Sequence, residues 1–118
     1  MISYQIISVD ALEESMMNNT EIIKQMIPMY LGQGVQDFSD LEAAVYTKNY
    51  AEIKAKAHHI KPTIQYLGAT ELRLKFQKLE DSALNQEPIH EIAALFEDIK
   101  KDFELAMNEL KSYQLTLK

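Results

Sequence analysis

Apolar residues recur every three or four positions along most of the 118-residue chain. This spacing places side chains on one face of an α-helix, whereas a β-strand would need strict alternation. The most regular stretch lies near the C-terminus, where steps of four and three alternate without interruption. Its apolar positions are Ile92, Phe96, Ile99, Phe103, Ala106, Leu110 and Tyr113.

The first part of the chain predicts a short helix after an extended segment. Residues 1–7 lack the helical period and are expected to be extended. Asp10 and Glu13 have the spacing of a capping box, in which two side chains satisfy the free N–H groups of the first turn. The helix that they begin is expected to end near Asn18-Asn19.

A second amphipathic helix is expected to begin at Asn19 or Thr20, since either residue can cap a helix. Pro28 lies in its interior and should kink it, because proline has no N–H to donate and its ring clashes with the preceding turn. Residues 32–34, Gly-Gln-Gly, predict a bend or break. Beyond them the helical period resumes as far as Lys48.

Residues typical of helix ends mark the boundaries of the remaining helices. Asn49 is a good N-cap for a helix that should run to Leu67, with Gly68 in the C′ position. Another helix follows and ends before a turn at residues 85–88. Pro88 closes this turn and is expected at the first position of the last helix.

These segments predict an all-α fold. Four long amphipathic helices with connections of about two to five residues favour an antiparallel up-down four-helix bundle. The short N-terminal helix is expected across one end. The length suffices for one hydrophobic core, so residues 1–118 are expected to form a single domain.

Composition and charge narrow the possible functions. The formal net charge is −6, and no basic stripe is present, so binding to nucleic acid is not expected. The chain has no cysteine, which excludes disulfides and thiolate chemistry. No apolar run has the length of a membrane span, and the N-terminus lacks the pattern of a signal peptide. We therefore expect a cytoplasmic protein that is not bound to a membrane.

His58 is the side chain best suited to chemistry. On its predicted helix it lies about 100° from the apolar stripe. Lys61 and Gln65, three and seven residues further on, share its face. Ala55 and Pro62 flank this face with short side chains and leave the imidazole accessible. An accessible histidine with a cation one turn away suits nucleophilic use of the ring.

The residues around His58 resemble the histidine-containing phosphotransfer (HPt) family. The common pattern of that family is Ala-His-x-Leu-Lys-Gly, then Leu-Gly, then a helix whose motif ends in Leu-Glu. The matching segments are Ala57-His58-His59-Ile60-Lys61, Leu67-Gly68 and Leu79-Glu80. The resemblance covers nearly the whole chain, because the family's helical bundle accounts for every helix predicted above.

The resemblance implies that His58 accepts a phosphoryl group and exchanges it with an aspartate of a response-regulator receiver domain. A hybrid sensor histidine kinase is the other implied partner. Lys61 would offset the negative charge of the phosphoryl group, and Glu80 would bond Nδ1–H of His58 and leave Nε2 as the nucleophile. Gln65 is a further possible phosphoryl contact. The chain would be a monomeric carrier without enzymatic turnover or cofactor of its own, and Mg²⁺ would belong to the receiver.

The sequence departs from the family pattern at position 62, where proline replaces the usual glycine. Proline has no N–H for the carbonyl of His58, so a local kink is expected there. His59 is the rival nucleophile, although it points about 100° away from His58. The register of the motif favours His58.

The sequence leaves three other functions open. A histidine-kinase dimerisation domain also carries a histidine followed by a basic residue and a proline, but its proline comes one residue later than Pro62 and its bundle needs two chains. A structural adaptor with HPt shape would need no phosphotransfer at all. A metal-binding bundle is disfavoured, because no two histidines are spaced to share a helix face.

Overall fold

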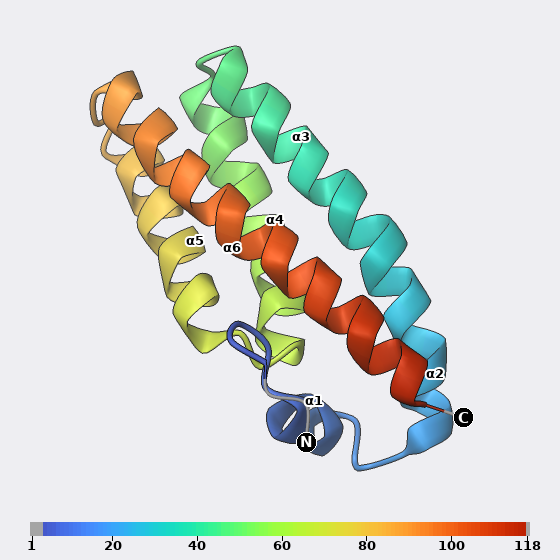
Figure 1. Ribbon diagram of the computed structural model, residues 1–118. Helices are drawn as coiled ribbons and strands as arrows, with labels where there is room; N and C mark the ends of the chain where they lie inside the picture. Colours follow the sequence, from blue (N-terminus) through green and yellow to red (C-terminus); the bar gives the residue numbers. More distant parts are fainter. Residues whose placement is uncertain (1–3, 118) are drawn as a thin grey trace.

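The computed structural model describes residues 4–117, which fold into helices joined by short connections (Figure 1). No strand occurs among these residues, so the predicted all-α class is confirmed. The helical elements are α1 (Val9–Ser15), α2 (Thr20–Met29), the π-helical segment η1 (Tyr30–Gly34), α3 (Val35–Tyr46), α4 (Tyr50–Tyr66), α5 (Thr70–Leu84) and α6 (Ile89–Thr116).

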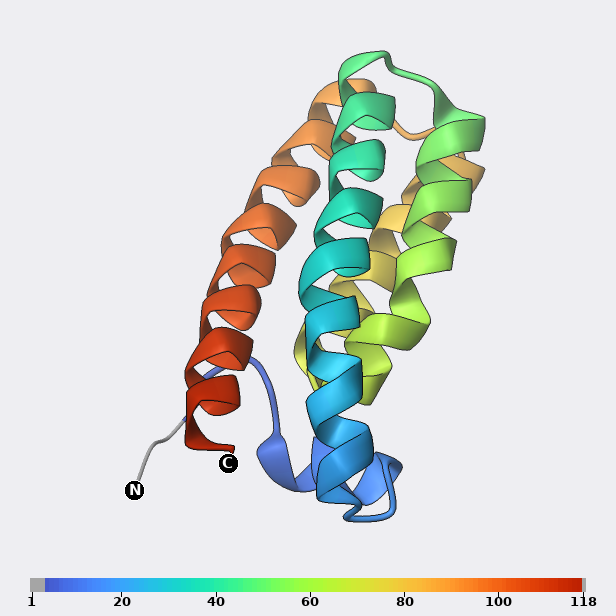
Figure 2. The ribbon, with the colours of Figure 1, turned by 90° about the vertical axis from the view of Figure 1, so that its right-hand side faces the viewer.

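The helices form the predicted antiparallel four-helix bundle, 46 × 23 × 19 Å in extent. α2, η1 and α3 run on as one rod, and α4, α5 and α6 complete the bundle (Figure 2). α4 packs between α3 and α5, and α6 packs against α5 and the α2–α3 rod. The seam between α4 and α5 therefore lies on the opposite side of the bundle from the seam between α3 and α6.

The prediction of a bend or break at residues 32–34 is wrong. The backbone stays helical through Gly34, which has φ −61° and ψ −41°, and one π-helical turn replaces the break. A Cβ at Gly34 would lie 3.8 Å from Cγ2 of Thr63, so this glycine faces α4. Packing against α4 stabilises the helical path here, where sequence propensity alone indicates an interruption.

Three of the predicted helix caps are confirmed. Asn19 accepts hydrogen bonds from the backbone N–H groups of Glu21 and Ile22, and Asn49 accepts one from Glu52. Gly68 has φ +69° and occupies the C′ position after α4. This conformation strains residues that carry a Cβ, which explains the glycine.

Three other boundaries differ from the prediction. Ser8, not Asp10, caps α1, because its hydroxyl accepts a hydrogen bond from the N–H of Ala11 at 3.2 Å. α1 also ends at Ser15, before the expected boundary near Asn18-Asn19. Pro88 is the N-cap of α6 rather than its first helical residue, because its ψ of 134° lies outside the helical range.

The N-terminal segment closes one end of the bundle, as expected for the short helix. The N–H of Ser8 donates to the carbonyl of Leu67 at 3.0 Å, and a Cβ on Gly68 would come within 2.8 Å of Ser8 and Ala11. Residues 4–8 lie outside the helices, but Gln5 and Ile6 form a bend, so this part of the lead-in is not extended as expected; residues 1–3 fall outside the described part. The buried carboxylate of Glu109, which the sequence did not single out, accepts the backbone N–H groups of residues 5–7 at 2.6–3.0 Å.

The core is aromatic at its centre. Phe38 of α3 stacks on Phe103 of α6 with ring centroids 4.2 Å apart, and it meets Phe76 of α5 edge to face at 6.3 Å. α4 contributes a row of aliphatic side chains at the helical spacing read from the sequence. These are Ile53, Ala57, Ile60 and Ile64, all fully buried. The apolar stripe of α4 thus faces inward and fixes which residues of this helix remain outside.

Candidate functional site

His58 lies on the outer face of α4, beside α5. Its Nδ1 is 2.8 Å from Oε1 of Glu80 on α5. The imidazole is 73% exposed, whereas the Glu80 side chain is only 14% exposed. An ionised carboxylate can only accept, so Nδ1 carries the proton in this bond and the lone pair resides on Nε2.

Lys61 approaches the same carboxylate from one turn further along α4. Its ammonium lies 3.1 Å from Oε1 of Glu80 and donates to Oε1 of Gln77 at 2.6 Å. Gln77 in turn donates to Oε2 of Glu80 at 3.3 Å and to Asp81 at 2.9 Å. Sequence reasoning missed Gln77, although its position three residues before Glu80 places it on the same face of α5.

These contacts determine the charge of Glu80. Burial alone would raise the pKa of this carboxyl, but the hydrogen bonds from Lys61 and His58 outweigh burial, and the net pKa lies below its ordinary value. Glu80 is therefore ionised near neutral pH and accepts from both donors. Lys61 and Glu80, which are both mostly buried, thus hold the exposed ring of His58 in one orientation.

A shallow hollow of about 300 Å³ opens beside His58, between α4 and α5. Gln65 lines this hollow together with Lys61 and Pro62, so the residues expected to share the face of His58 do so. Arg73 of α5 lines it from the opposite side and was missed in the sequence. The available signal was its spacing of seven residues from Glu80, which is two helical turns.

His59 points to the other side of α4, toward α3. Its Nε2 lies 3.6 Å from Oδ2 of Asp37, too far for a hydrogen bond, and Asp37 accepts a hydrogen bond from the side-chain amide of Gln33 at 2.9 Å. The imidazole of His59 is 67% exposed. The two adjacent histidines thus belong to different seams of the bundle, as their 100° separation predicts.

α4 remains helical through Pro62. The carbonyl of His58 has no N–H at position 62 to accept from, and Pro62 is exposed to solvent. The kink expected at this point stays a prediction.

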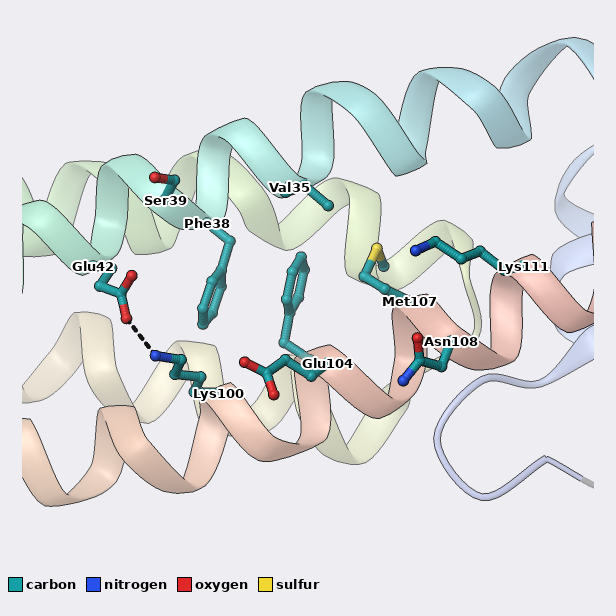
Figure 3. A pocket seen from close by; sticks show the side chains of 10 residues that line it. Val35, Phe38, Ser39, Glu42, Lys100, Glu104, Met107, Asn108 and Lys111 are labelled. Carbon is teal, nitrogen blue, oxygen red and sulfur yellow. Dashed lines mark hydrogen bonds and ion pairs between the residues drawn. The ribbon is translucent and has the colours of Figure 1, made fainter.

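A second, larger hollow of about 440 Å³ lies in the seam between α3 and α6 (Figure 3). Phe38 and Phe103 line its apolar part, and an ion pair of 2.8 Å between Lys100 and Glu42 crosses the seam. None of the site residues predicted from the sequence lies there. The candidate chemistry is confined to the α4/α5 seam, on the other side of the bundle.

Among the residues that the structure describes, no three histidine, cysteine, aspartate or glutamate side chains lie close enough together to hold a metal ion. Within residues 4–117, no helix has both the length and the apolar character that a membrane crossing requires.

The bundle, with its extra helix across one end, has the fold of the histidine-containing phosphotransfer proteins. It is similar to the crystal structure of histidine-containing phosphotransfer protein B (HptB) from Pseudomonas aeruginosa PAO1. The TM-score is 0.87 at 18% sequence identity, and the match covers 98% of this chain and 100% of that one. No protein-family model matches the sequence, and the search of curated proteins found no match. The resemblance seen in the sequence is confirmed at the level of the fold.

Proposed function

We propose that the chain is a phosphorelay intermediate that carries a phosphoryl group on Nε2 of His58. The observation that carries this proposal is the 2.8 Å contact between Nδ1 of His58 and Glu80, in a bundle with the HPt fold. A carboxylate on Nδ1 fixes the tautomer, leaves the lone pair on Nε2 and keeps the ring in one orientation. Transfer of a phosphoryl group depends chiefly on such positioning and on charge stabilisation.

The phosphoryl donor would be the aspartyl phosphate of a receiver domain. Nε2 of His58 attacks phosphorus, the bond between phosphorus and the aspartyl oxygen breaks, and the aspartate leaves as a carboxylate. The imidazole becomes a positively charged phosphoimidazolium whose Nδ1–H remains bonded to Glu80. The reverse transfer uses the same atoms.

Each neighbour of His58 has a distinct role in this proposal. Glu80 is a positioning residue that also stabilises the positive ring. Lys61 keeps Glu80 ionised and places a positive charge one turn from the phosphoryl group. Gln65 lies in the adjoining hollow, where its amide can donate to a phosphoryl oxygen. Mg²⁺ bound by the receiver would supply further charge stabilisation during transfer.

The proposed partners are a response-regulator receiver domain and a hybrid sensor histidine kinase. We expect the receiver to dock across α4 and the helix before it, with His58 within its reach. In this role the chain is a carrier without turnover of its own, and it would meet its partners in the cytoplasm. Its four long helices complete a bundle within one chain, which supports a monomer.

A four-helix bundle completed within one chain disfavours a histidine-kinase dimerisation domain, since such a domain builds its bundle from two chains. A structural adaptor with HPt shape is the remaining alternative. It would need neither the bond from His58 to Glu80 nor the second bond from Lys61 to the same carboxylate.

The test is phosphoryl acceptance from a panel of receiver domains carrying radiolabelled aspartyl phosphate. We expect the chain to take up label that is labile in acid and stable in base, as phosphohistidine is. Stable binding of a receiver without any label, from any donor, would instead support the structural adaptor.

A further inference from the structure

Arg73 is the only arginine of the chain, and it lines the hollow beside His58. It lies on α5, half-buried, across the seam from Gln65 on α4. α4 and α5 run antiparallel, with His58 opposite Glu80 and Lys61 opposite Gln77. Arg73 continues this row of pairs by one further turn toward the end of α4.

The two cations that line this hollow differ in their partners. Lys61 is held by Glu80 and Gln77, and only 12% of its side chain is exposed. Arg73 forms no ion pair with a carboxylate anywhere in residues 4–117, whereas its neighbour Lys75 on α5 is paired with two aspartates of α6. An arginine without a carboxylate is available to bind an external anion.

A phosphoryl group on His58 would need a positive charge other than that of Lys61. Glu80 and Lys61 neutralise each other across the seam. A phosphoryl group adds close to two negative charges at neutral pH, and three strong acceptor oxygens. A guanidinium presents a planar fork of donors that matches two of these oxygens at once, which an ammonium cannot do.

We propose that Arg73, together with Gln65, binds the phosphoryl oxygens once His58 is phosphorylated. The inference rests on the proposed function, since it assigns an anion site to the phosphoryl group that His58 would carry. Gln65 contributes an amide donor from α4, and Arg73 contributes the charge from α5. The phosphoryl group on Nε2 would then lie against the hollow rather than in open solvent.

The experiment uses phosphoramidate as the donor, because this small molecule needs no protein partner. Nε2 of His58 attacks phosphorus, the bond from phosphorus to nitrogen breaks, and ammonia leaves. We compare the natural chain with Arg73→Gln, Arg73→Lys and, as a charge-matched control, Lys78→Gln. Lys78 is exposed on the same helix but points about 140° away from Arg73.

Arg73→Gln should slow phosphorylation by phosphoramidate about 10-fold, the lower end of the effect expected for loss of one charge-assisted contact. Arg73→Lys should fall between this variant and the natural chain, and Lys78→Gln should match the natural chain. The ³¹P resonance of the phosphohistidine should also shift in Arg73→Gln, because the environment of the phosphoryl oxygens has changed.

Two results would overturn the inference while leaving the proposed function intact. The first is an unchanged rate and an unchanged ³¹P resonance in Arg73→Gln. The second is a slower phosphorylation of Arg73→Gln that is seen only when a phosphorylated receiver is the donor. Arg73 would then bind an acidic side chain of the partner rather than the phosphoryl group. If the natural chain takes no phosphoryl group from phosphoramidate or from any receiver, the proposed function fails and the inference with it.

Discussion

His58 and His59 are adjacent in the sequence and similarly exposed, yet the bundle gives them different surroundings. His58 faces the α4/α5 seam, where Nδ1 meets a carboxylate at 2.8 Å and leaves Nε2 free. His59 faces the α3/α4 seam, where it is Nε2 that approaches a carboxylate, at 3.6 Å. Exposure alone therefore does not distinguish the two side chains.

The two carboxylates are also similar in burial, with exposed fractions of 14% for Glu80 and 11% for Asp37. Their partners differ. Glu80 is bound by the ammonium of Lys61, while Asp37 is bound by the neutral amide of Gln33. A histidine becomes a usable nucleophile when its Nδ1 is fixed by an ionised group that is itself fixed. Only the α4/α5 seam provides this arrangement for one of the two rings.

The largest effect is expected from removing each ring in turn. His58→Gln should abolish phosphoryl acceptance, because no other nucleophile occupies its position. His59→Gln should retain acceptance within about 2-fold, since its ring contacts nothing in the α4/α5 seam. The measurement is uptake of label from a phosphorylated receiver.

Both variants should keep the helical circular dichroism and the midpoint of thermal unfolding, because both side chains are mostly exposed. If label were retained in His58→Gln and lost in His59→Gln, the phosphoryl acceptor would be His59, in the α3/α4 seam.

Replacing the two carboxylates is the next largest test. Glu80→Gln should slow transfer by about 10-fold, because the amide oxygen can still accept from Nδ1–H but the acceptor has lost its charge, a difference of about 1.4 kcal/mol. Asp37→Asn should leave the rate within about 2-fold, since Asp37 does not reach His58. Single-turnover transfer from a phosphorylated receiver measures both rates. Equal effects of the two substitutions would mean that Glu80 acts only through its charge and not through its bond to Nδ1.

The fold could be predicted from the sequence because its signals are local and repeated. The step of three and four residues along α4 and α6 fixes which side chains are buried, and Asn19, Asn49 and Gly68 mark boundaries by their own chemistry. The prediction of a break at the glycines of η1 was wrong, because the segment packs into the bundle as a continuous helix, with Gly34 facing Thr63 of α4. Such long-range packing is not visible in a local pattern.

The site could be predicted only in part, for the same reason. His58, Lys61 and Gln65 share one helix, so their common face follows from spacing alone. Glu80 came from the resemblance to the HPt family, and its distance from His58 needed the structure. Gln77 and Arg73 were missed because the register of α5 against α4 depends on how the whole bundle packs.

A smaller effect is expected from Lys61, which contacts Glu80 and, in the proposed function, acts on His58 through it. Lys61→Ala should slow transfer by about 3- to 10-fold, because Glu80 loses a charged donor and the phosphoryl group loses a nearby positive charge. Lys101→Ala is a matched control, since Lys101 is exposed on α6 and does not line the hollow. The bundle should remain folded in both variants, as judged by circular dichroism. An unchanged transfer rate in Lys61→Ala would remove the proposed role of this residue.

The smallest effect concerns stability and its dependence on pH. The pKa of Glu80 in the folded chain lies below its ordinary value of 4.5, because the hydrogen bonds from Lys61 and His58 outweigh the opposing effect of burial. The unfolded chain therefore takes up this proton first as the pH falls. The contribution of ionised Glu80 to the free energy of unfolding is therefore fully present above pH 4.5. It is lost as the pH falls through the pKa of Glu80 in the folded chain.

Glu80→Gln lacks this carboxylate, so it should be less stable than the natural chain near pH 7, by about 1 kcal/mol. The difference should shrink below pH 4.5, where the natural chain loses the same contribution. Urea unfolding of both chains between pH 7 and about pH 3 measures the two free energies of unfolding. A difference that stays constant across this range would show that the ionised form of Glu80 does not stabilise the seam. The contrast between the two histidines would then depend on the orientation of the ring alone.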